Sequence, residues 1–172
     1  MKTLIHWKVF FILWLAAILS TLAVLPYVLE LQAELLADVE LPIPLPALIM
    51  LQIAQSGLLF AIVIFFGMIL MKRIGLSTPI LDSVTRGESA SDKIRAILPL
   101  SIMLGVIASL LIIGLDLYVF QPALLRELGD SANALNLQTS QPAAWKGFLA
   151  SFYGGIAEEI LLRLFVMSLL AW

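Results

Sequence analysis

Three charged residues lie close together inside an otherwise apolar stretch near the end of the sequence. They are Glu158, Glu159 and Arg163. In an α-helix Glu159 and Arg163 are four residues apart and share a face, so we expect them to form an ion pair. Glu158 is turned about 100° from Glu159, and the residue four positions after it is Leu162. We therefore expect one paired carboxylate and one carboxylate without a local counter-charge.

An unpaired carboxylate in a low-dielectric environment has a raised pKa, which suits a group that takes and returns protons near neutral pH. Gly154 and Gly155 precede Glu158 by about one turn and leave bare backbone, where water, a neighbouring helix or a substrate peptide can approach. The alternative interpretation is a polar clamp between helices. A clamp does not require a doubled acid, so we favour proton transfer by Glu158.

The composition sets the environment of this cluster. The chain has 172 residues, of which 62% are hydrophobic and 13% charged, and its mean hydropathy is +1.06. These values exclude an ordinary soluble domain and indicate a protein embedded in a lipid bilayer. The net charge of −2 excludes a basic surface for nucleic acid. With no Cys and one His, disulfides, thiolate metal sites and an HExxH zinc site are excluded, and we expect no metal and no cofactor.

Charges mark the ends of the apolar segments, because an ionised side chain is costly in hydrocarbon. Four runs are long enough for a membrane-spanning helix, which needs roughly 20 apolar residues. They cover residues 9–29, 47–71, 96–121 and 147–172. We therefore predict an all-α protein: a polytopic transmembrane helical bundle with four spans that forms a single domain over residues 1–172.

The distribution of Lys and Arg predicts the orientation of the bundle. Lys2 and Lys8 precede the first span, and five more basic residues lie between Lys72 and Arg95. All charged residues of the loop between the first two spans are acidic. Since the more basic side remains inside, we place the N-terminus and the 72–95 loop in the cytoplasm. That loop looks polar and mobile, and we assign no chemistry to it.

Several other polar residues fit structural roles better than catalytic ones. For Asp116, at about the depth of Gln52 and Gln55, we favour a structural hydrogen bond with them over catalysis. For His6 we favour a position among the lipid headgroups, and residues 30–40 fit either an interfacial helix or a solvated connector. Gly105 and Ser109 have the spacing that allows close helix approach. The four tryptophans lie mostly near span ends and are interpreted as interfacial anchors; they are Trp7, Trp14, Trp145 and Trp172.

The run GGIAEEILLRLF, residues 154–165, resembles the first signature of the CAAX protease and bacteriocin-processing family. In that signature a doubled Glu is followed, four residues after its second member, by Arg. The resemblance implies an intramembrane endopeptidase that hydrolyses peptide bonds of membrane-associated proteins or peptides. Glu158 would help to activate the attacking water, and Glu159 and Arg163 would orient the site. It also implies an integral membrane protein of a bacterial-type plasma membrane.

Two later histidine signatures of the family supply a second water-activating group and the oxyanion donors. Neither is present, because His6 precedes the first motif and the chain ends at Trp172. We expect this chain to be the N-terminal part of a longer protein, with a degenerate family member as the alternative. We therefore expect no proteolysis from this polypeptide alone, and the site needs further C-terminal helices or a partner subunit.

Two other functions compete with the protease. One is a non-catalytic membrane scaffold or bacteriocin immunity protein, which acts by binding partners. The other is half of a proton-coupled transporter, with Glu158 carrying the proton and Asp116 in the pathway. The transporter would need broken helices or inverted repeats, for which only Gly154 and Gly155 are candidates.

Overall fold

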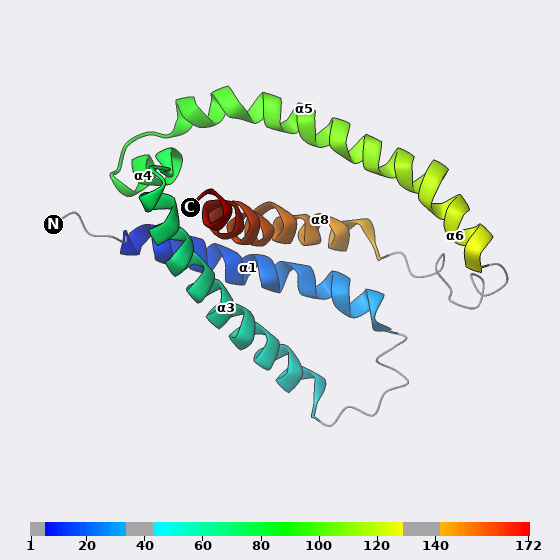
Figure 1. Ribbon diagram of the computed structural model, residues 1–172. Coiled ribbons are helices and arrows are strands. Elements are labelled where there is room, and N and C mark those ends of the chain that lie inside the picture. Colours follow the sequence, from blue (N-terminus) through cyan, green and yellow to red (C-terminus); the bar gives the residue numbers. More distant parts are fainter. Residues whose placement is uncertain (1–5, 34–42, 129–141) are drawn as a thin grey trace. The chain divides into compact units, whose positions relative to one another are not determined.

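The protein is described by a computed structural model that covers residues 6–33, 43–128 and 142–172 (Figure 1). Within these ranges the chain is helical and contains no strand, which confirms the all-α prediction. The elements in chain order are α1 (Trp7–Leu31), α3 (Leu45–Arg73), α4 (Pro79–Thr85), α5 (Ser91–Leu115), η1 (Asp116–Phe120), α6 (Gln121–Leu128), α8 (Ala144–Phe152), η2 (Tyr153–Glu158), η3 (Ile160–Met167) and α9 (Ser168–Ala171).

Three of the helical segments are long and apolar enough to cross a membrane. They are Trp7–Leu31, Leu45–Arg73 and Ser91–Glu127. Each contains one of the first three predicted spans and extends beyond it at both ends. α3 carries Pro46 in its first turn, where the backbone N–H has no helical partner and its absence costs nothing. Lys72 and Arg73 lie in its last turn, where positive charge is favourable. Segments of this kind indicate an integral membrane protein.

The fourth segment, from Ala144 to Ala171, begins three residues before the predicted span and carries the charged cluster. It is continuous but not uniformly α-helical, because η2 and η3 are wide π-type turns. We expected regular α-helical spacing here, and the structure corrects it. A π turn is closed by i→i+5 bonds and holds more residues than an α turn. Successive side chains are therefore less than 100° apart around the axis.

The described chain divides into two compact units, one of Met1–Thr85 with Gln141–Trp172 and one of Arg86–Ser140. In the first unit, α1 packs against α3, α8 and η2, and α3 packs against η3 and α9 (Figure 1). Lys146 Nζ at the start of α8 lies 2.7 Å from Glu30 Oε2 near the end of α1. These two helices therefore run antiparallel.

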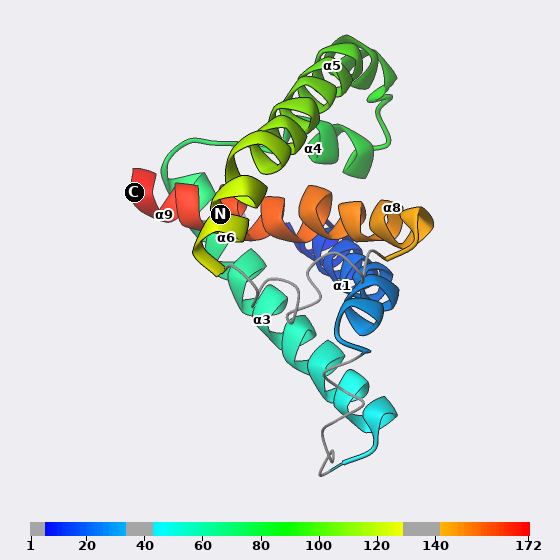
Figure 2. The same ribbon diagram turned by 90° about the vertical axis from the view of Figure 1, so that its right-hand side faces the viewer.

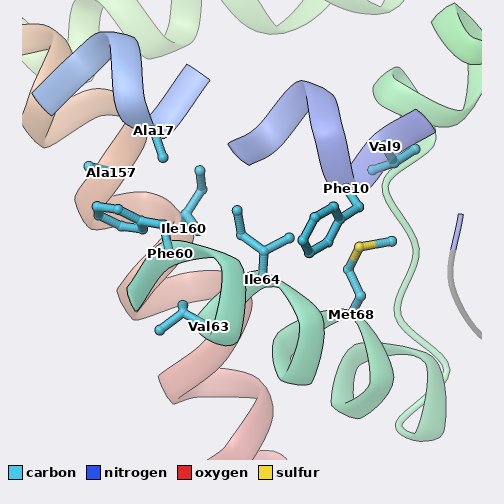
Figure 3. Packing of buried hydrophobic residues seen from close by; sticks show 9 residues of the cluster. All are labelled: Val9, Phe10, Ala17, Phe60, Val63, Ile64, Met68, Ala157 and Ile160. Atoms are coloured by element: carbon cyan, nitrogen blue, oxygen red, sulfur yellow. The ribbon is translucent and has the colours of Figure 1, made fainter. Parts of the chain in front are cut away.

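The interior of the first unit is a continuous apolar cluster (Figure 3). Its buried members come from three segments and are Val9, Phe10, Ala17, Phe60, Val63, Ile64, Met68, Ala157 and Ile160. Since lipid tails are as apolar as these side chains, close packing rather than removal from water holds the helices together. Figure 2 shows the same segments from a second direction, with α1 and α8 again adjacent.

Gly67 of α3 allows this close packing, and the sequence analysis did not identify it. A Cβ added at Gly67 would lie 3.0 Å from both Cγ and the carbonyl oxygen of Leu164 in η3. At Gly57 the carbonyl oxygen accepts a hydrogen bond of 2.8 Å from the indole Nε1 of Trp14. Trp14 therefore joins α1 to α3, a role that the sequence analysis did not predict.

The 72–95 segment, expected as a polar and mobile loop, contains the short helix α4. Thr78 precedes its first residue, Pro79, and the Thr78 hydroxyl donates to Asp82 Oδ1 at 3.3 Å. Gly75 and Gly87 flank the helix with φ of 77° each, a backbone conformation that glycine adopts without steric cost. Polar composition suggested a loop, but the Thr-Pro start and the acid in the first turn are helix signals.

The second unit consists of α5, η1 and α6. α5 buries no side chain within the described part of the chain. Asp116 Oδ2 accepts a hydrogen bond of 3.1 Å from Gln121 Nε2, one turn further along the same segment. A Cβ at Gly105 would meet nothing within 4 Å. Most of the possible interfacial helix at 30–40 lies outside the described residues.

Candidate functional site

Glu158 ends η2 and lies on the exposed side of the first unit. Within the described ranges its carboxylate has no hydrogen-bond or ion-pair partner. A Cβ added at Gly154 would lie 3.6 Å from Glu158 Oε2, and one added at Gly155 would meet nothing within 4 Å. The carboxylate therefore lies beside uncovered glycine backbone. Within the described ranges, the space beside Gly155 is open.

Glu159 and Arg163 form the expected ion pair. Arg163 Nε lies 3.1 Å from Glu159 Oε2, and the side chains are 76% and 49% exposed, respectively. The ion pair forms in spite of the π turns, because two residues that are four positions apart still lie on nearly the same side of the wider helix. One acid of the doublet is thus neutralised by its neighbour, and the other is available to a substrate or solvent.

A pocket of about 400 Å³ lies against this ion pair. Its polar lining comes from η3, α9 and the connection between α3 and α4, and consists of Glu159, Arg163, Ser168, Ser77 and Thr78. Its apolar lining comes from α1, α3, that connection and η3, and consists of Leu13, Met71, Leu76, Ile160 and Leu164. The pocket is large enough for a small ligand. Glu158 does not line it, so the two acids face different surroundings.

A smaller pocket of about 150 Å³ shares one wall with the first, made of Met71, Leu76, Ser77 and Thr78. It adds His6, Lys72 and Asp82 to the polar groups at this end of the unit. His6 therefore lines a cavity and is adjacent to the basic end of α3. Its position among the lipid headgroups stays a prediction.

The remaining sequence predictions fall outside this site. Asp116 bonds Gln121 in its own unit, and Gln52 and Gln55 are exposed on α3. Among the described residues, no three acidic or histidine side chains are placed to hold a metal ion. The sequence analysis missed Ser77 and Thr78. The sequence signal for these two residues was the order Ser-Thr-Pro, which is typical of a helix start. It follows the basic end of the second predicted span.

The arrangement can support acid–base chemistry at one position. A paired acid next to an unpaired acid gives two carboxylates in different electrostatic environments, as in sites where one group transfers protons and the other orients its surroundings. Hydrolysis would also require donors for the oxyanion. Among the described side chains that line the pocket, Arg163 is the one that carries a fixed positive charge.

No protein-family model matches the chain, and no curated protein and no solved structure matches it significantly.

Proposed function

We propose that the chain provides the glutamate-bearing part of an intramembrane endopeptidase of the CAAX protease type. The observation that supports this most directly is that one of the two neighbouring acids is paired with a cation and the other is not. Glu159 is held by Arg163 at 3.1 Å, whereas Glu158 has no partner within the described ranges. The EExxxR spacing and the apolar helix around it add to the same interpretation.

In this proposal Glu158 acts as the general base. Its carboxylate accepts a proton from a water molecule while the oxygen attacks the carbonyl carbon of the peptide bond. When the tetrahedral intermediate collapses, the C–N bond breaks and the protonated Glu158 gives the proton to the leaving nitrogen. The products are a carboxylate and an amine. Bare backbone at Gly154 and Gly155 leaves space for the substrate strand.

The donors that stabilise the oxyanion come from outside this chain. The resemblance calls for two histidine groups after the motif, and the single histidine of the sequence, His6, precedes it. We propose that further helices or a partner subunit supply them on the exposed side of Glu158. On its own the 172-residue chain is then expected to bind peptide poorly and to hydrolyse none.

The same proposal includes the membrane topology. The chain crosses the bilayer four times with its N-terminus inside, and the fourth span is the segment Ala144–Ala171. Lys72 and Arg73 at the end of α3 lie with the N-terminus of α1 on the cytoplasmic side. The substrate is a protein or peptide anchored in the plasma membrane.

The test is reconstitution with the missing groups. The chain is co-expressed with the helices that carry the two histidine signatures of a complete family member and placed in liposomes. Cleavage of a fluorogenic peptide with an isoprenyl anchor is then measured. We expect turnover only with both parts present, and a loss of roughly 10²–10⁴-fold for Glu158→Gln, the usual contribution of a positioned general base.

Glu88→Gln is the matched control, because Glu88 is an exposed acid between α4 and α5. It should leave turnover unchanged. Glu158→Gln with full turnover, or no cleavage by a complex whose assembly is verified, would contradict the proposal. A biological phenotype that persists in Glu158→Gln would instead favour a scaffold that binds partners without cutting them.

A further inference from the structure

The pocket beside the ion pair has features that peptide hydrolysis does not use. It combines one cation and one anion, hydroxyls from Ser77 and Thr78, and an apolar wall. The adjoining smaller pocket is also lined by one cation, Lys72, and one anion, Asp82. Each cavity is thus balanced in charge. A ligand that complements such a cavity carries both charges itself, because a purely anionic group would meet the neighbouring carboxylate.

Arg163 and Glu159 can bind two opposite groups at once. Their closest contact is through Arg163 Nε, and the guanidinium carries five N–H donors, more than one carboxylate oxygen satisfies. The side chain is 76% exposed, so its outer nitrogens are accessible to a phosphate. Glu159 is about half exposed and can accept hydrogen bonds from an ammonium group beside that phosphate.

The surroundings of the pocket indicate a lipid rather than a water-soluble ligand. Its apolar wall includes Leu13 of α1 and Ile160 and Leu164 of η3, which together cover one side of the cavity with hydrocarbon. At the same end of the unit, Arg73 lies over the ring of Trp172, with 5.7 Å between its guanidinium carbon and the ring centroid. Basic and aromatic side chains gather at the headgroup level of a bilayer.

We propose that this pocket binds the headgroup of a phospholipid that carries both a phosphate and a primary ammonium, as in phosphatidylethanolamine. The phosphate binds Arg163 and the hydroxyl of Ser77. The ammonium binds Glu159, and the acyl chains lie along the apolar wall. The site is independent of Glu158, which does not line the pocket.

The test measures lipid binding to the purified chain by native mass spectrometry in detergent. Phosphatidylethanolamine is titrated in parallel with phosphatidylcholine, whose quaternary ammonium donates no hydrogen bond, and with phosphatidylglycerol, which has no cation. Free phosphoethanolamine tests whether the headgroup alone suffices. We expect phosphatidylethanolamine to bind at least about tenfold more tightly than the other two lipids, the usual effect of losing one charge-assisted hydrogen bond.

Arg163→Gln should weaken phosphatidylethanolamine binding by about tenfold or more, whereas Arg126→Gln on α6, the matched control, should not. If Arg163→Gln loses its helical circular dichroism signal, Ser77→Trp replaces it, because the larger side chain fills the pocket without changing the ion pair. Equal binding of the three lipids would overturn the proposal, as would equal affinities of the pocket variants and the control. Tight binding of free phosphoethanolamine would identify a soluble ligand and overturn the lipid assignment.

Glu158→Gln separates this inference from the proposed protease. It should abolish cleavage in the reconstituted complex and leave the affinity for phosphatidylethanolamine unchanged. Failure of the protease test alone therefore leaves the lipid site standing, and failure of the lipid titration leaves the protease proposal standing.

Discussion

Trp14 and Glu158 show two ways in which polar groups occur among apolar helices. The indole of Trp14 donates to the carbonyl oxygen of Gly57 in the neighbouring helix and has a defined structural role. The carboxylate of Glu158 has no partner in the described part of the chain. A group that stabilises the fold should affect unfolding when it is changed, and one that serves chemistry should not.

The hydrogen bond of Trp14 gives the first prediction. Trp14→Phe keeps an aromatic ring but removes the N–H, so the Gly57 carbonyl loses its second partner. We expect unfolding in mixed micelles to become easier by roughly 0.5–2 kcal/mol, the range for interhelical hydrogen bonds in membrane proteins. Titration with a denaturing detergent, followed by circular dichroism, measures this change.

Trp7→Phe is the control for this experiment, because the Trp7 side chain is 56% exposed and its ring lies against Phe10 and Phe11 of the same helix. It should unfold like the wild type. Equal destabilisation by both substitutions would mean that ring size, and not the hydrogen bond, holds α1 against α3.

The packing of α3 against η3 gives a prediction about whole elements. A Cβ at Gly67 would approach the carbonyl oxygen of Leu164 to 3.0 Å, and backbone cannot move aside as a side chain can. We expect Gly67→Ala to separate the two helices and to cost about 1–3 kcal/mol, as overpacking usually does. The same detergent titration measures it.

Gly57→Ala offers a matched comparison on the same helix. There the added Cβ would lie 3.6 Å from its nearest neighbour, Ile18 Cδ1, which is an ordinary contact. We expect little change in stability. A larger loss at Gly57 than at Gly67 would contradict the close approach of α3 and η3.

The approximate extent of the three long helices could be predicted from the sequence, because charged residues bound the apolar runs, although Pro26 and Pro99 lie inside α1 and α5. The ion pair of Glu159 and Arg163 could also be predicted, since it depends only on local spacing. The pocket could not, because Leu13, Met71 and Ser77 are far apart in the sequence and meet only through packing. The close approach at Gly67 could not be predicted either, because spacing alone does not determine which glycine of which helix meets a neighbour.

The π turns of η2 and η3 were also beyond the sequence analysis. The apolar pattern of residues 153–167 fits either a helix of 3.6 residues per turn or a wider one, because nearly every position is apolar. A helix that is hydrophobic on all sides gives no periodic signal to distinguish them. The faces assigned to Glu158 and Glu159 from the α-helical period were therefore approximate.

At the scale of the whole molecule, the orientation in the membrane can be tested directly. The sequence contains no cysteine, so any introduced thiol is the only one in the chain. Gln32→Cys, after α1, should react with a membrane-impermeant maleimide added to intact cells. Ser89→Cys, between α4 and α5, should react only after the cells are permeabilised. Both positions are exposed, so accessibility depends on the side of the membrane.

The opposite labelling pattern would place the N-terminus outside and reverse the proposed topology. Labelling of both positions in intact cells would mean that α3 does not cross the bilayer. The four-span arrangement predicts one further result, that Ala143→Cys, just before α8, behaves like Gln32→Cys.

The segment from Ala144 to Ala171 is fastened near both ends, by Lys146 to Glu30 and by Trp172 beneath Arg73. Two such attachments resist rolling of the helix about its long axis. The flank that bears Glu158 is consequently kept turned away from α1 and α3. Within this unit, a molecule can therefore reach that carboxylate from the exposed side without passing between the helices.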